Sequence, residues 1–106
     1  MKAEKLALFT DALETAGQID AYEIYCKTPK AKKGRLSERI LAGAKKHGAT
    51  PEEINALTST KDKAREEKLG LFKDEAADCK NVDFLFEKYV LLQKLGEQTS
   101  AIIDAE

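Results

Sequence analysis

The stretch HGATPEEINAL, residues 47–57, contains the clearest structural signals in the chain. Gly48 is a residue that commonly ends a helix, because glycine adopts the left-handed conformation without steric cost. Thr50 can cap the helix that follows, Pro51 fits its first position, and Glu53 completes a capping box. The sequence therefore predicts that one helix ends and the next begins here, with only a short connection between them.

Apolar residues recur at helical spacing on both sides of this stretch. Alanine, leucine, lysine and glutamate dominate the composition, and all four favour helices. Short connections make consecutive helices antiparallel. We therefore predict a single all-α domain over residues 1–106, an up-and-down bundle of four helices at residues 3–27, 35–47, 51–78 and 82–104. Gly17 and Gly70 are candidate breaks within the first and third helices, although Gly17 could instead let a neighbouring helix approach closely.

The composition limits the class of protein. A chain of 106 residues forms one domain with a modest core. Its hydrophobic content of 42% and charged content of 35% exclude a disordered chain. No apolar run reaches the roughly 20 residues that a membrane span requires. The formal net charge of -1 argues against a general attraction to nucleic acid or to anionic lipid.

Two cysteines, Cys26 and Cys79, fall where the first and third predicted helices end. In an up-and-down bundle these two points lie at the same end, so we predict a disulfide between them, with Cα atoms within roughly 4.4–6.8 Å. The alternative is a pair of buried free thiols. The third helix is polar nearly all round in its middle, residues 58–68. Loss of the disulfide is therefore predicted to loosen the third helix first.

A disulfide is typical of an oxidising compartment. The cysteine pair therefore predicts an exported protein, periplasmic in a bacterium or extracellular. No signal peptide is visible before the first amphipathic segment, so export requires that the signal has been removed. The alternative is a cytoplasmic protein with free thiols, in which Met1 is the native start.

The sequence contains no constellation that predicts catalysis. His47 is the only histidine, and it lies at the end of a predicted helix, where the helix dipole favours a cation. The chain has no paired metal-ligand spacing, no C-x-x-C motif and no glycine-rich phosphate loop. We therefore predict a non-enzymatic protein without a metal or cofactor.

A basic segment at residues 27–39 carries six positive charges and a single acid. Its candidate contacts for an anion or a partner are Lys30, Lys32, Lys33 and Arg35, and the alternative is a solvated loop. The sequence argues against nucleic-acid binding for two reasons. The predicted helix at residues 51–78 begins with acidic residues, and no aromatic platform accompanies the basic segment. A cytosolic regulatory or nucleic-acid-associated protein nevertheless stays as one alternative function.

The last predicted helix is apolar around most of its circumference. Such a helix is either central in the core or shared with a partner. The candidate interface residues are Phe84, Val90, Leu91 and Leu95. The partner could also be a second copy of the chain, which would form a homodimer through this helix. The leading hypothesis is a protein that acts by binding another protein. A carrier of a small apolar ligand, held between the first and last helices, is a further alternative.

Overall fold

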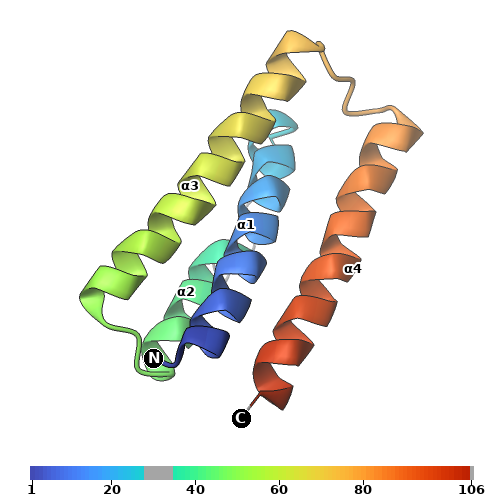
Figure 1. Ribbon diagram of the computed structural model, residues 1–106. Coiled ribbons are helices and arrows are strands. Elements are labelled where there is room, and N and C mark those ends of the chain that lie inside the picture. Colours follow the sequence, from blue (N-terminus) through green and yellow to red (C-terminus); the bar gives the residue numbers. More distant parts are fainter. Residues whose placement is uncertain (28–34, 106) are drawn as a thin grey trace.

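The computed structural model describes residues 1–27 and 35–105. Its helices are α1 (Ala3–Tyr25), α2 (Leu36–Lys46), α3 (Pro51–Asp74) and α4 (Val82–Asp104), and the described ranges contain no strand. The helices run alternately up and down, and both termini lie at the same end of the bundle (Figure 1). The predicted all-α, up-and-down bundle is therefore confirmed. The basic loop predicted at residues 28–34 lies outside the described residues.

The connection between α2 and α3 follows the sequence signals. Thr50 Oγ1 accepts a hydrogen bond from the Glu53 amide at 3.1 Å, and the Glu53 carboxylate accepts one from the Thr50 amide at 2.8 Å. This reciprocal pair is the predicted capping box. Gly48 has a φ of 88° and places the chain in the left-handed region just after α2. The backbone amides of Gly48 and Ala49 bond to carbonyls in the last turn of α2 and close that helix.

Two expectations about helix continuity are wrong. Helices α1 and α3 continue through Gly17 and Gly70, because a glycine inside a helix costs only about 1 kcal/mol and the surrounding packing outweighs it. Helix α3 ends at Asp74 rather than at residue 78. The helix ends there because Ala76 adopts the left-handed conformation, with a φ of 49°. The Ala77 amide then donates a hydrogen bond to the carbonyl of Phe72 in the last turn and caps the helix.

The left-handed conformation of Ala76 leads to a stability prediction. A non-glycine residue is disfavoured there, because its Cβ crowds the backbone. Ala76→Gly is therefore expected to raise the free energy of unfolding by about 0.5–1 kcal/mol, as chemical denaturation would measure. Ala77→Gly, one residue further along, is the control and should give no such gain. A loss of stability in Ala76→Gly would contradict the proposed helix end.

Helix α1 is the central helix of the bundle. It packs against each of the other three helices, and its pairing with α3 is the most extensive. Gly17 allows this pairing, because its missing side chain leaves room for the carbonyl of Lys61 and the methyl group of Ala64. Residues 58–68, although polar nearly all round, therefore take part in the closest helix pairing of the bundle. Small residues bring the two backbones close together where large apolar side chains are absent.

The core divides into two parts along α1. The larger part surrounds Leu13 and includes the buried residues Phe9, Ala12, Ala16, Ile19, Ala44, Leu57, Leu95 and Ile102. The smaller part is aromatic, and the ring centroids of Tyr22, Phe72 and Phe84 lie 4.6–4.8 Å apart. The Tyr22 hydroxyl donates a hydrogen bond to Glu87 at 3.1 Å. The aromatic part therefore joins α1, α3 and the first turns of α4.

The disulfide lies at the aromatic end of the bundle. Cys26 and Cys79 have Cα atoms 5.7 Å apart, within the predicted range, and the predicted pairing is confirmed. The bond joins the end of α1 to the connection that precedes α4. A cysteine pair in this arrangement is of the kind found in oxidising compartments.

Helix α4 is peripheral. Of the helices that the structure describes, only α1 comes close to the α4 backbone, and Figure 1 shows α4 standing apart from α3. The alternative that the last helix is central in the core is therefore wrong, because α1 takes that place. Within the described residues, no helix has the length and apolar character needed to cross a membrane.

Candidate binding groove between α2 and α4

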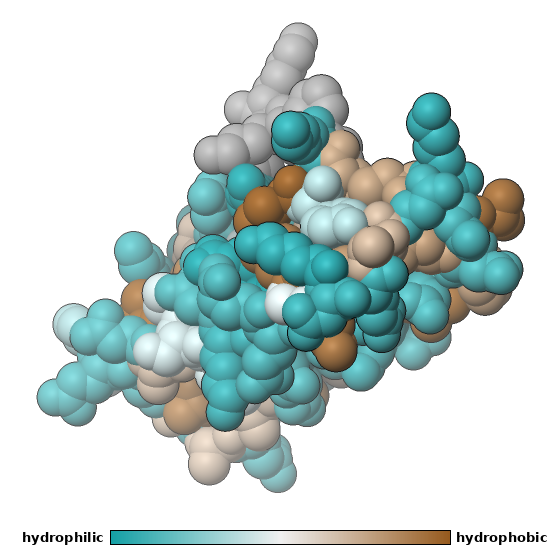
Figure 2. Space-filling model, turned by 90° about the horizontal axis from the view of Figure 1, so that it is seen from above, coloured by the Kyte–Doolittle hydropathy of each residue, from teal (hydrophilic) through white to brown (hydrophobic). Residues whose placement is uncertain are grey.

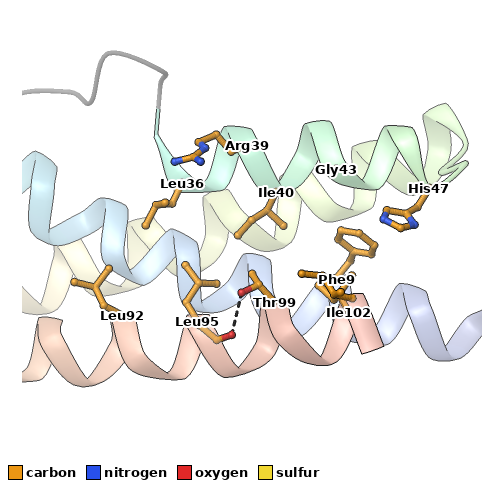
Figure 3. Close-up of a pocket in the computed structure, with 12 residues that line it drawn as sticks. Phe9, Leu36, Arg39, Ile40, Gly43, His47, Leu92, Leu95, Thr99 and Ile102 are labelled. Atoms are coloured by element: carbon orange, nitrogen blue, oxygen red, sulfur yellow. Dashed lines mark hydrogen bonds between the residues drawn. The ribbon is translucent and has the colours of Figure 1, made fainter. Parts of the chain in front are cut away.

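A groove of about 520 Å³ opens between α2 and α4. Its floor is formed by α1, and its walls are the facing sides of the two other helices (Figure 3). Most of the lining is apolar, and the lining residues are Phe9, Leu36, Arg39, Ile40, Gly43, His47, Leu92, Leu95, Gly96, Thr99, Ile102 and Ile103. The volume falls within the range of about 300–1,000 Å³ that ligand sites commonly have.

The groove results from the way α2 and α4 rest on α1. Helix α2 has only 11 residues and α4 has 23, and in the described structure their backbones do not come into close contact. Gly43 and Gly96 face the groove and add no side chain to it. The ring of Phe9 rises from the floor, and its centroid lies 5.6 Å from that of His47. The two helices therefore leave the groove open along its length.

The polar groups of the groove are few. Arg39 lies at its edge and His47 near one end (Figure 3). The Thr99 hydroxyl donates to the carbonyl of Gly96 at 3.0 Å. The lining residues that the structure describes include no carboxylate and no thiol.

An uncharged stripe follows the outer side of α4 and includes one wall of the groove. Its positions repeat at spacings of three and four residues, which place them on one side of a helix. We call it the outer stripe, and it consists of Val82, Leu85, Phe86, Tyr89, Leu92, Gln93, Gly96, Thr99, Ser100 and Ile103. None of these residues is charged, in a chain of which 35% is charged. Seen from the disulfide end, hydrophobic residues reach the surface on the side where α4 lies (Figure 2).

Large apolar side chains of the outer stripe are exposed. Val82 is 77% exposed, Phe86 60% and Ile103 67%. The rings of Phe86 and Tyr89 contact each other, with centroids 6.3 Å apart, and Gln93 donates a hydrogen bond to the Tyr89 hydroxyl at 3.1 Å. An exposed apolar surface of this extent is typical of an interaction site rather than of scattered surface residues.

The structure places the four candidate interface residues on different sides of α4. Leu95 is buried in the core, while Phe84 and Leu91 are partly buried against it. Val90 is exposed. Of the four, Val90 is therefore the one with a largely exposed side chain, and Leu95 also lines the groove. Sequence reasoning did not single out Phe86 and Tyr89 as exposed, although the three-and-four spacing of a second, uncharged stripe was visible in the sequence.

Three of the four basic residues predicted to contact an anion or a partner lie outside the described residues, namely Lys30, Lys32 and Lys33. Arg35 is described, and it lies half-buried at the start of α2. Its positive charge acts on the buried carboxyl of Asp20, as do those of nearby Lys61 and Arg65. Arg35 therefore has an interaction inside the bundle, and the alternative of a nucleic-acid contact stays a prediction.

Asp20 is a buried carboxyl between α1 and α2. Its Oδ2 accepts a hydrogen bond from the Ser37 hydroxyl at 2.6 Å, while Oδ1 has no hydrogen-bond partner among the described residues. Burial raises the pKa of Asp20 from its usual value, and the Ser37 hydrogen bond and the Arg35 charge only partly offset this. The folded protein therefore binds a proton at Asp20 more readily than the unfolded chain does.

This raised pKa predicts the sign of a pH effect. Asp20 stabilises the fold most below the ordinary carboxyl pKa of 3.8, and this contribution decreases as the pH rises through the raised value. Asp20→Asn should therefore remove a decrease in unfolding free energy that the wild type shows as the pH rises above about 4. Denaturation at several pH values measures the difference. Asp11→Asn, on the exposed side of α1, is the control and should keep the wild-type profile.

Comparisons with known protein families, with characterised proteins and with solved structures find no match for this chain. Among the described residues, no group of three histidine, cysteine, aspartate or glutamate side chains could hold a metal ion. The fold and the site therefore define the protein as a small helical bundle with a disulfide-bonded cysteine pair and an open apolar groove.

Proposed function

We propose that the chain is a non-enzymatic binding protein that docks an amphipathic helix of a partner protein along α4. The observation that carries this proposal is the outer stripe, which is uncharged, exposed and continuous with the groove between α2 and α4. Burial of such a surface against a partner is favourable, because it removes apolar area from water. The cores of protein interfaces are likewise depleted of charge and enriched in aromatic residues.

The spacing of the outer stripe favours a helix as the docked element. Positions separated by three and four residues form the seam of a helix that packs against another helix. The 23 residues of α4 extend over about 35 Å at the usual rise of 1.5 Å per residue. Val82 and Phe86 lie beyond the groove lining, so a compact ligand within the groove would leave them exposed. A docked helix would cover the whole surface.

Two further features support parts of this proposal. The lining, as far as the described residues form it, carries no acidic or thiol group, which favours binding over catalysis. The pairing of Cys26 with Cys79 favours a role in an oxidising compartment, periplasmic or extracellular. Mass measurement before and after reduction and alkylation tests the redox state directly. Free thiols in the isolated native protein would remove the support for export.

Site-specific photo-cross-linking tests the docking surface. Benzoylphenylalanine at Tyr89, in the outer stripe, is expected to form a defined protein adduct in the cells that make the protein. The same group at Lys94, an exposed position on a different side of α4 from the stripe, is the control and should form no such adduct. Phe86→Ser in the Tyr89 variant should weaken the adduct, because it removes a large exposed anchor. No adduct at Tyr89 would contradict the proposal.

A carrier of a small apolar ligand is a second candidate function, favoured by the volume and apolar lining of the groove. Such a carrier would bind one long-chain fatty acid per chain, with its tail between α2 and α4. Displacement of a fluorescent fatty acid from the purified protein measures this binding. Ile40→Arg, which places a charge in the apolar wall, should abolish it. Unchanged binding in that variant would contradict the groove as the ligand site.

A further inference from the structure

We propose that the helix docked on the outer stripe is α4 of a second copy of this chain, in antiparallel orientation. The twofold axis passes near Leu92 and Gln93, at the middle of the stripe. This inference rests on the proposed function and names the partner of the same surface. It follows from the distribution of side-chain size and charge along the stripe.

Side-chain size differs between the two halves of the outer stripe. The half before Leu92 carries the exposed side chains of Leu85, Phe86 and Tyr89. The half after Gln93 carries Gly96, Thr99 and Ser100 before it ends at the exposed Ile103, and it forms a wall of the groove. Nothing lies within 4 Å of the position that a Cβ of Gly96 would occupy. The first half therefore projects from the surface, and the second half is hollow from Gly96 to Ser100.

An antiparallel pair brings each projecting half against the hollow half of the other copy. With the axis near Leu92 and Gln93, Tyr89 lies opposite the second copy's Gly96, and Phe86 lies opposite its Thr99. Large side chains then meet small ones, which gives the close packing that protein interiors require. A parallel pair would place the aromatic residues against each other and leave the glycines facing a void.

The absence of charged residues in the outer stripe also favours a second copy as the partner. A twofold interface brings the same surface patch together with itself, so any charge near the axis would face a like charge. The outer stripe carries none. An unrelated partner helix could instead place an opposite charge against a charged residue of the stripe, which a second copy cannot do at the axis. The absence of charge is therefore the property that self-association requires.

Sedimentation measurements on the disulfide-bonded protein test the dimer. We expect a species of twice the 11.7 kDa chain mass, whose proportion increases with concentration. Gly96→Leu fills the hollow and should raise the dissociation constant by at least about 30-fold. It should leave the monomer folded, because nothing in the same chain lies within 4 Å of the added Cβ and the position is exposed. Gly70→Leu is the matched control, since Gly70 also lies in a helix with open space around it but is outside the stripe. This control should leave the dissociation constant unchanged.

Cross-linking tests the orientation. Val82→Cys and Ile103→Cys are made separately, mixed, and treated with a short bis-maleimide. The antiparallel arrangement predicts mixed dimers between the two variants, and few cross-links when Val82→Cys is treated alone. Cross-linking of Val82→Cys to itself would overturn the antiparallel arrangement. A chain that stays monomeric at all concentrations would overturn self-association.

These outcomes separate the inference from the proposed function. If the adduct at Tyr89 contains a different protein and the purified chain is monomeric, the inference fails and the proposed docking surface remains. If Tyr89 forms no adduct and the chain is monomeric, both fail. An adduct with twice the chain mass, lost in Gly96→Leu and retained in Gly70→Leu, supports both.

Discussion

Replacing Cys26 and Cys79 together with serine is expected to lower the free energy of unfolding by about 4 kcal/mol. The disulfide links residues 53 positions apart, and its loss restores to the unfolded chain the freedom of that long loop. For a domain of this size, a change of about 4 kcal/mol corresponds to a decrease in melting temperature of roughly 15–30 °C. Thermal unfolding followed by circular dichroism measures the decrease. A loss below about 1 kcal/mol would mean that the bond constrains the unfolded chain much less than the loop-entropy argument requires.

The same double variant should loosen α4 first. The sequence alone predicted that α3 would loosen, but α3 has the most extensive packing on α1, whereas the α4 backbone approaches only α1 among the described helices. The disulfide joins the end of α1 to the connection just before α4. Hydrogen exchange should therefore increase first near Val82 and Phe84. Reduced wild-type protein is the control and should behave as the double variant does. Earlier exchange in α3 would contradict this order.

Gly17→Ala is expected to destabilise the protein, although alanine is the better helix former. An added Cβ would overlap the carbonyl oxygen of Lys61 and press against Ala64, so α1 and α3 would have to separate. Overpacking of this kind costs about 1–3 kcal/mol, and the gain of about 1 kcal/mol in helix propensity offsets only part of it. A larger residue such as leucine should cost more, because it would force the central helix pair further apart.

Two other glycines provide matched controls for this prediction. Gly70 and Gly96 also lie inside helices, but nothing lies within 4 Å of a Cβ at either position. Gly70→Ala and Gly96→Ala should therefore each raise the unfolding free energy, by up to about 1 kcal/mol. Chemical denaturation of the three variants should give opposite signs for Gly17 and for the controls. A stabilising Gly17→Ala would show that the close contact between α1 and α3 is not as described.

A dimer through α4 would also increase the stability of α4, which is the peripheral helix of the single chain. In the single chain, the α4 backbone comes close only to α1 among the described helices, and one side of α4 is apolar and exposed. Docking of a second copy would cover that side and would add stability that increases with the logarithm of the chain concentration. The melting temperature should then increase with protein concentration in the wild type, and this dependence should be lost in Gly96→Leu.

The sequence by itself determined the helices and the disulfide pairing. The capping box at Thr50 and Glu53 and the helix-ending Gly48 are local signals, because each acts through atoms within a few residues of the chain. Short connections then fixed the up-and-down order, and that order brought Cys26 and Cys79 to one end. The end of α3 was misplaced, because Ala76 does not belong to the residue types that usually adopt a left-handed conformation.

Only the tertiary structure decided which helix is central and which surface stays exposed. Helices α1 and α4 are both rich in apolar residues, and periodicity cannot rank them. The contact of Gly17 with the α3 backbone brings α1 to the centre, and this contact depends on residues more than 40 positions apart in the chain. Once α1 is central, Phe84, Leu91 and Leu95 turn inward. Phe86 and Tyr89 are left outside, because the rotation of a helix about its own axis is set by its neighbours rather than by its own sequence.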